Sequence, residues 1–98
     1  MYAVINHLHL SIPVDHVTPS VEQEGAPLLA SLPGFRGFQF VKVAEDRAVV
    51  LILWEDAAAA QSGAKFFGPT WFAQNLAPHL ASEQQRSAGE VVVSLAIP

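Results

Sequence analysis

Residues 48–54 limit the possible fold most strongly, because an apolar side chain occupies every position of this segment. The run reads Ala48-Val49-Val50-Leu51-Ile52-Leu53-Trp54. Consecutive side chains of a strand point to opposite faces of its sheet, so a strand of this composition is apolar on both faces. The run therefore predicts a strand that needs to be covered on two sides.

Three further segments have the pattern of strands. In residues 2–12, apolar and β-branched side chains alternate, with Asn6 among the apolar residues of one face and His7 and His9 on the other. The pair Glu45-Asp46 predicts a tight turn, which makes a hairpin of the strands on either side of it. The predicted strands are residues 2–12, 35–43, 47–55 and 90–97.

The first helix is expected between the first two strands. Thr18 is a suitable N-cap with Pro19 in the first helical position, and the apolar residues continue to about Leu32. Because proline removes a helical hydrogen bond and crowds the preceding turn, we expect this helix to kink or break near Gly25 and Pro27.

The second helical region is expected before the last strand. Asp56 is placed to cap a short helix on the alanine run 57–60. Gly63 and Gly68 predict interruptions, followed by a second helical piece over residues 69–80. The buried stripe of that piece would consist of Phe72, Leu76 and Leu80.

The element order is βαββαβ, which predicts an α+β fold of the ferredoxin-like type with a four-stranded antiparallel sheet. Two helices can cover only one face of such a sheet. The apolar residues on the other face of strand 47–55 then need a second sheet, and an identical subunit is the simplest donor. We therefore predict a homodimer through the sheet face, with shielding by crossover loops as the alternative.

Composition narrows the function classes. The 98 residues suit one domain, residues 1–98, and charged residues make up only 14%. A net charge of −4 without a Lys/Arg cluster argues against a nucleic-acid partner. The chain has no cysteine and no apolar run long enough to span a bilayer, so disulfides and a membrane anchor are not expected. We expect a cytoplasmic protein.

Three motifs occur in an order and spacing that resemble the antibiotic biosynthesis monooxygenase (ABM) family. They are Leu32-Pro33-Gly34-Phe35-Arg36-Gly37-Phe38, then Leu53-Trp54-Glu55-Asp56, then Asn75-Leu76-Ala77-Pro78. The resemblance covers nearly the whole chain. It implies a ferredoxin-like fold, two subunits that pair into a dimeric α+β barrel, and a pocket in each subunit between sheet and helices.

Members of this family include monooxygenases that oxidise polycyclic phenols without metal or flavin, heme-degrading enzymes, and proteins that modify quinones or signal molecules. The cofactor-free oxygenases are similar in having an Asn and a Trp at the positions of Asn6 and Trp54, but their second Asn is replaced here by Val50. Heme-degrading members use a Trp and an axial His on the second helix. This chain has Gly63 at the Trp position, and His79 is displaced from the axial position.

The resemblance implies Asn6 and Trp54 as catalytic residues, without a cofactor and without a metal. Each candidate also has a purely structural explanation: a backbone group or water could satisfy the Asn6 amide, and Trp54 and the other aromatic residues could simply fill the core. His79 could cap a helix. The residues expected to bind substrate are Val50, Ile52, Phe67, Trp71, Phe72 and His79.

Two further polar features remain open. His7 and His9 project to one face of a strand and could begin a metal site, but no third ligand is near them in sequence, which favours a role at an interface. Arg86 lies in a polar segment, residues 82–87, that is expected to be an exposed loop able to close over the mouth of a pocket.

The sequence thus predicts a cofactor-independent monooxygenase for an aromatic or quinol-type small molecule. Two alternatives remain. One is a non-catalytic domain of the same fold that binds a small molecule or acts in a stress response, and the other is a heme-binding or heme-degrading protein.

Overall fold

A computed structural model describes residues 1–95 of the chain. Its centre is a four-stranded antiparallel sheet, with strand order β2-β3-β1-β4. The predicted hairpin, the α+β class and the ferredoxin-like order of elements are confirmed. The strands are β1 (Tyr2–His9), β2 (Phe35–Ala44), β3 (Arg47–Trp54) and β4 (Gln85–Glu90).

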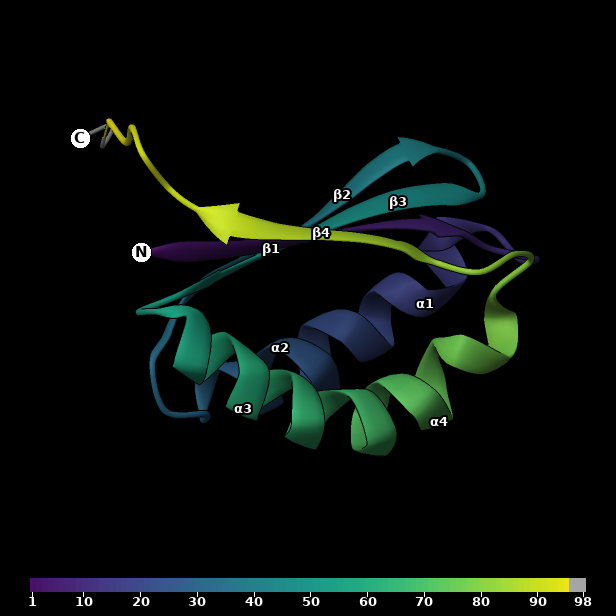
Figure 1. Cartoon of the computed structure of the whole chain (residues 1–98). Helices are drawn as coiled ribbons and strands as arrows, with labels where there is room; N and C mark the ends of the chain where they lie inside the picture. Colours follow the sequence, from purple (N-terminus) through teal and green to yellow (C-terminus); the bar gives the residue numbers. More distant parts are fainter. Residues whose placement is uncertain (96–98) are drawn as a thin grey trace.

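All helical segments lie on one side of the sheet (Figure 1). The first helical region of this layer consists of α1 (Val14–Ser20), the π-helical segment η1 (Val21–Gly25) and α2 (Ala26–Ala30). The second consists of α3 (Ala57–Phe67), the π-helical segment η2 (Gly68–Phe72), α4 (Ala73–Asn75) and the 3-10 turn η3 (Ala77–His79). Within residues 1–95, none of these helices is long and apolar enough to cross a membrane.

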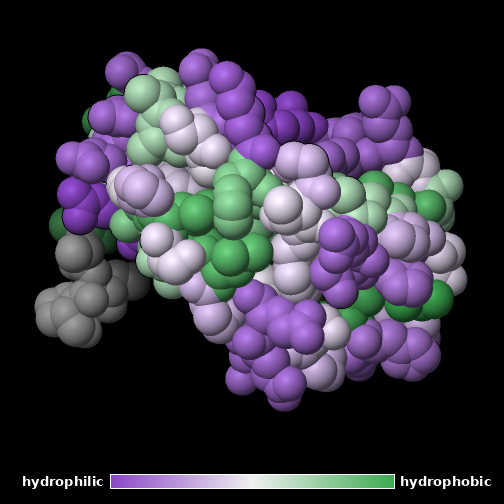
Figure 2. Space-filling view, turned by 90° about the horizontal axis from the view of Figure 1, so that it is seen from below, coloured by the Kyte–Doolittle hydropathy of each residue, from purple (hydrophilic) through white to green (hydrophobic). Residues whose placement is uncertain are grey.

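The core lies between the sheet and this helix layer. The inner face of β3 contributes its even-numbered residues, which are buried, and β1 adds Val4 and Leu8. On the helix side, hydrophilic residues surround a smaller hydrophobic area (Figure 2), as expected for a surface that meets water. The buried apolar residues are Val4, Leu8, Leu10, Val14, Val17, Val21, Leu29, Ala48, Val50, Ile52, Trp54, Ala60, Trp71 and Leu76.

The first helix begins five residues earlier than predicted, at Val14 instead of Pro19. The Thr18 hydroxyl, instead of capping a helix end, donates to the Val14 carbonyl oxygen (2.9 Å). Val14, Val17 and Val21 form a buried stripe on the inner side of this helix, and burial of that stripe outweighs the capping preference of Thr18. Pro19 consequently lies inside the helix.

The second helical region is more continuous than predicted. Asp56 caps α3 as expected, with its Oδ1 accepting from the Ala59 amide (2.8 Å). Gly63, however, does not interrupt the helix, which continues to Phe67 and passes into η2 at Gly68. The predicted stripe is confirmed, because Leu76 is buried and Phe72 and Leu80 pack against the core.

The prediction of the last strand was wrong in position. β4 consists of the mostly polar residues Gln85–Glu90, which pair with β1 and are all exposed, whereas the mostly apolar residues 91–95 lie beyond it. An edge strand is held by its backbone hydrogen bonds on one side, so it does not need the apolar composition on which the prediction relied. Residues 96 and 97 of the predicted strand lie outside the described residues.

Candidate functional site

A cavity of about 210 Å³ opens between the inner face of the sheet and the helix layer. Its floor comes from β1, β2 and β3, and its walls come from η1, α3 and η2. The lining is almost entirely apolar, which is typical of pockets that bind small organic molecules. The residues that line it are Val4, Asn6, Val21, Gly25, Leu29, Phe38, Phe40, Val50, Ile52, Trp54, Gly63, Ala64, Phe67, Gly68, Trp71, Phe72, Leu76, Gln84 and Arg86.

Asn6 supplies the polar group of the cavity floor. It lies at the middle of β1, opposite Val50 on β3 and Arg86 on β4. Its Oδ1 atom is buried and has no hydrogen-bond partner among the described residues. An unpaired buried acceptor costs about 1–3 kcal/mol, so a ligand that donates an O–H or N–H to Asn6 would recover this energy.

Arg86 and Gln84 add polar groups where β4 borders the cavity. The expectation of a loop at Arg86 was wrong, because Arg86 lies within β4 and shares its register position with Asn6, whereas its expected exposure is confirmed. Its guanidinium is the only charge among the described residues of the lining. A donor of fixed positive charge beside an unpaired acceptor suits a ligand with a hydroxyl group and an anionic or carbonyl oxygen.

Trp54 lies at the end of β3 and is only 2% exposed. Its indole packs edge-on against Phe35, with ring centroids 6.0 Å apart. Gly63 of α3 passes over the same indole so closely that a Cβ atom at this position would overlap the ring. The sequence reasoning missed this role of Gly63, although a glycine in the middle of an alanine-rich helix is a signal of close packing.

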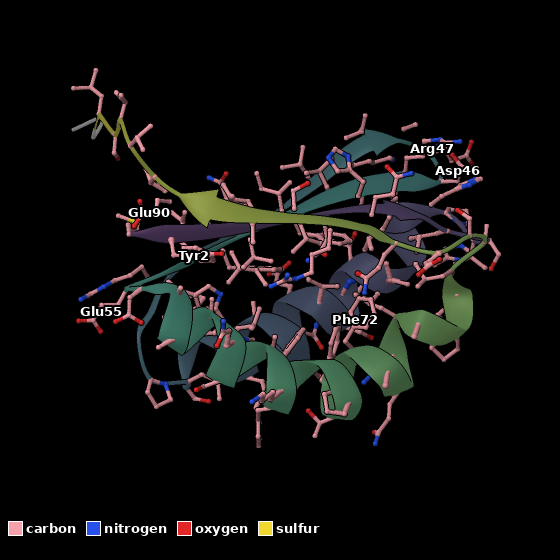
Figure 3. All side chains as sticks on the ribbon, in the orientation of Figure 1. Tyr2, Asp46, Arg47, Glu55, Phe72 and Glu90 are labelled. Carbon is pink, nitrogen blue, oxygen red and sulfur yellow. The ribbon has the colours of Figure 1, made fainter. Side chains whose placement is uncertain are left out.

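The aromatic wall is held together by contacts between the two π-helical segments. Phe67 and Trp71 are stacked, with centroids 5.6 Å apart, and the Trp71 indole N–H donates to Glu24 Oε1 (3.2 Å). Gly25 lies against the Trp71 ring, because a Cβ there would be 3.0 Å from ring carbons. Phe72 lies between the helix layer and the sheet (Figure 3). π-helical segments are rare and frequently occur at functional sites, and both segments here line the cavity.

The structure brings most of the predicted site residues together. Seven of them line one cavity: Asn6, Val50, Ile52, Trp54, Phe67, Trp71 and Phe72. His79 does not line it. The backbone carbonyl of His79 instead accepts from the amide and hydroxyl of Ser11 (2.7 and 3.1 Å), which joins η3 to the end of β1.

The two histidines of β1 lie apart from the cavity. His7 and His9 are on the outer face, and His9 Nε2 lies 3.0 Å from Asp46 Oδ2 at the hairpin turn. Figure 3 places Asp46 and Arg47 at the end of the sheet opposite Tyr2 and Glu90. Within the part of the chain that the structure describes, no group of three His, Cys, Asp or Glu residues could hold a metal ion.

Heme is a further candidate ligand, because the family that the sequence resembles includes heme-degrading enzymes. Protein side chains that hold heme iron are His, Cys, Met and Tyr. None of the described residues that line the cavity is of these types. The cavity therefore offers apolar surface to a flat ligand and no side chain for its iron.

Comparison with known proteins identifies solved structures with the same fold. No protein-family model matches the chain, and no curated protein sequence matches it. Solved structures do match. SnoaB, a cofactor-independent oxygenase from Streptomyces nogalater, is 18% identical with a TM-score of 0.79, over 96% of this chain and 95% of SnoaB.

Two other structures extend the comparison. The heme-degrader MhuD from Mycobacterium tuberculosis, solved with two hemes in its active site, is 25% identical with a TM-score of 0.64, over 98% of this chain and 100% of MhuD. The monooxygenase ActVA-Orf6 from Streptomyces coelicolor, solved with nanaomycin D, is 12% identical with a TM-score of 0.72, over 99% of this chain and 92% of the other. The order of elements, the sheet and these likenesses lead to one conclusion: this chain has the ferredoxin-like fold of the antibiotic biosynthesis monooxygenases.

Proposed function

We propose that this protein is a cofactor-independent monooxygenase for an electron-rich aromatic or quinol-type molecule. The observation that carries the proposal is the unpaired Asn6 Oδ1, buried in an aromatic-walled cavity with the Arg86 guanidinium at the same register position of the next strand. Oxygenases of this fold, such as SnoaB, support the reaction type. The proposed substrate carries a hydroxyl group near a second oxygen.

In this proposal the protein orients the substrate and stabilises its anion. Asn6 accepts a hydrogen bond from a substrate hydroxyl, Arg86 attracts an oxygen that becomes negative, and Trp54 and Phe67 bound the ring faces. The electron-rich anion then reduces dioxygen itself. For an anthrone, the ring CH2 becomes a carbonyl, one oxygen atom enters the product, the other leaves as water, and four electrons pass from substrate to dioxygen.

The lining residues determine how the substrate can lose its proton. Among the described lining residues, none is a carboxylate, histidine or lysine that could accept it. Substrate ionisation therefore depends on the pKa of the substrate and on the positive charge of Arg86. We expect the pH at half-maximal rate to move with the pKa of the substrate when substituted anthrones are compared. A midpoint that stays constant across the series would point to a protein base and contradict this assignment.

The direct test is oxygen consumption with an anthrone or a dihydroquinone. We expect Asn6→Ala and Arg86→Gln each to lower the rate, the second by about tenfold or more because charged hydrogen bonds contribute about 1.5–3 kcal/mol. Gln85→Ala is the matched control, since Gln85 is exposed on the same strand and does not line this cavity. Equal rates for wild type, Asn6→Ala and Arg86→Gln would remove the proposed roles.

A second candidate function is ligand binding without turnover. The position opposite Asn6 is Val50, so the paired strands β1 and β3 carry one amide on the cavity floor where the resemblance implies two. A binding domain would show a ligand-dependent rise in Tm without oxygen consumption. Titration with heme, followed at the Soret band, tests the third function, heme binding or degradation. Saturable heme binding would favour this function over the monooxygenase and over the binding domain without turnover.

We also propose a homodimer through the outer face of the sheet. Ile5, Leu51 and Leu53 lie on that face, half-buried, and no helix covers them in Figure 1. A second copy placed against this face would remove these side chains from water. Sedimentation equilibrium at micromolar concentration is the test. A protein that remains monomeric there would rule out the dimer and leave the cavity assignment to the oxygen assay.

A further inference from the structure

Two glycines of the helix layer are not required by the shape of the backbone. Gly25 lies in η1 and Gly63 lies in α3, and Gly34 is the only glycine with a positive φ among the described residues. Any residue could adopt the helical conformation of positions 25 and 63, and glycine is the least favourable choice in a helix after proline. Both positions therefore need the absence of a side chain.

Each of these glycines makes room for the ring of one cavity tryptophan. A Cβ atom at position 63 would overlap Cη2 of Trp54 and lie 2.6 Å from its Cζ2. A Cβ atom at position 25 would lie 3.0 Å from Cη2 and from Cζ3 of Trp71. In both cases the six-membered ring of the indole lies where a side chain would begin. We call these two places on the helices the Trp54 recess and the Trp71 recess.

Other aromatic and polar contacts hold the two indoles on their remaining sides. Phe35 packs edge-on against Trp54, with centroids 6.0 Å apart. Phe67 is stacked on Trp71, with centroids 5.6 Å apart, and Glu24 accepts from the Trp71 N–H (3.2 Å). Both tryptophans also line the cavity. Because the rest of the core is closely packed, an indole pushed out of its recess would move into the cavity.

The cavity has little space to spare for such a movement. An apolar cavity of about 150 Å³ holds benzene, and this cavity measures about 210 Å³. Carbon atoms in contact are about 3.5–4.0 Å apart, so an alanine at position 63 would displace the Trp54 ring by about 1 Å, and one at position 25 would displace the Trp71 ring by about 0.5 Å. Either displacement takes space that a second fused ring of a ligand would need.

We propose that Gly63 and Gly25 determine the size of the ligand, because each keeps one indole out of the space that a fused-ring phenol occupies. The preferred ligand class is then fused-ring phenols over single-ring phenols. This assignment rests on the proposed function in one respect, the binding of an aromatic ligand in the cavity, and does not depend on the reaction with dioxygen. Gly63 has the larger influence, since the overlap at position 63 is greater.

Dissociation constants for phenol and 2-naphthol test the assignment. The two ligands have the same hydroxyl group and differ by one fused ring, and calorimetry under nitrogen prevents their oxidation. We expect wild type to bind 2-naphthol more tightly than phenol. The ratio of the 2-naphthol Kd to the phenol Kd should rise about tenfold in Gly63→Ala and about threefold in Gly25→Ala, because an overfilled site excludes the larger ligand first.

Gly68→Ala is the matched control. Gly68 also lines the cavity, but a Cβ atom there would meet open space, so the ratio should equal that of wild type. A second-site variant adds a rescue. Trp54→Phe removes the part of the ring that would collide, so Gly63→Ala with Trp54→Phe should have a ratio within about threefold of that of Trp54→Phe alone. A purely structural role of Gly63 in α3 would not be rescued in this way.

An unchanged ratio in Gly63→Ala would overturn the assignment, as would an equal rise in Gly68→Ala or a failure of the rescue. If circular dichroism shows that Gly63→Ala does not fold, Gly25→Ala decides, and an unchanged ratio there overturns the assignment. Failure of the proposed reaction gives a different result, in which the ratios change as expected without oxygen consumption. Wild type that binds neither phenol would overturn the ligand-size assignment and the proposed function together.

Discussion

The two faces of β3 are both apolar and have opposite surroundings. On β3, Val50, Ile52 and Trp54 point inward and are buried under the helices, whereas Val49, Leu51 and Leu53 point outward and are half-buried. The inner face contains a ligand-sized cavity, and the glycines at positions 25 and 63 lie directly against the two tryptophans that line it. The pattern of apolar residues along a strand therefore shows which faces of a sheet must be removed from water. Whether helices or a second sheet bury each face depends on the rest of the fold.

Polar residues differ between the faces as well. On β1, Asn6 is the inner polar residue and has an unpaired buried acceptor, whereas His7 and His9 are on the outer side, where His9 is paired with Asp46. A buried polar group without a partner among the described residues is a candidate contact for a ligand or an ordered water. In the functions proposed above, the inner face is the binding surface and the outer face is the subunit interface.

The largest effect is expected on the inner face. Trp54→Ala should lower the free energy of unfolding by about 3–5 kcal/mol, because it leaves a large cavity under Gly63. Urea denaturation measures this change. Trp54→Phe is the control and should lose much less, since it keeps an aromatic ring in the same place. A loss below about 1 kcal/mol for Trp54→Ala would show that the inner face is not a tightly packed core.

An outer-face change should separate assembly from folding. Leu51→Asp is expected to raise the dimer Kd about 100-fold, or about 2.7 kcal/mol, because a charge would have to be buried between two sheets. Unfolding of the protomer should change by less than about 1 kcal/mol, since Leu51 is on the outer face of the sheet, where Figure 1 shows no helix. Sedimentation equilibrium gives the first quantity and urea denaturation at low concentration the second. Leu51→Met, which stays apolar, should behave as wild type.

A third change distinguishes a binding group from a structural one. Asn6→Leu should weaken binding of a phenolic ligand about tenfold, or about 1.4 kcal/mol, because the acceptor is lost. The free energy of unfolding should be equal or higher, since an unpaired buried acceptor has been removed. Calorimetry and urea denaturation provide the two values. A clear loss of stability with unchanged ligand binding would reverse the interpretation of Asn6.

The smallest effect is expected outside both faces. Asp56→Ala removes the N-cap of α3 and should cost about 1 kcal/mol of stability. Ligand affinity and dimer Kd should not change, because Asp56 is exposed, does not line the cavity and lies outside the strands of the sheet. Asp56→Ser keeps a capping oxygen and serves as control. A change in ligand affinity for Asp56→Ala alone would show that the cap also positions the cavity wall.

Much of the site could be predicted from the sequence. Asn6 and Trp54 were placed in one pocket by alternation along two strands together with the ABM resemblance, and the structure puts both in the same cavity. Arg86 was missed as a strand residue because its neighbours are polar, and polarity signals a loop more often than an edge strand. His79 was misplaced because helical spacing does not reveal how a chain bends into a 3-10 turn.

The glycines show the same limit. Gly63 was interpreted as a helix breaker, since glycine has low helix propensity. In the structure the helix continues through it, because contact between α3 and the Trp54 indole more than offsets the cost of glycine. Such a contact joins positions 54 and 63 across two elements, and local propensity contains no information about it.

The sequence by itself determined the order of elements, the antiparallel hairpin and the two-sided apolar character of β3, because these follow from periodicity and turn residues along a short stretch of chain. Only the tertiary structure decided the extent of β4, the pairing of Arg86 with Asn6 and the exposure of residues 91–95 beyond the sheet. These features depend on backbone hydrogen bonds between distant segments, and such bonds form with almost any side chain.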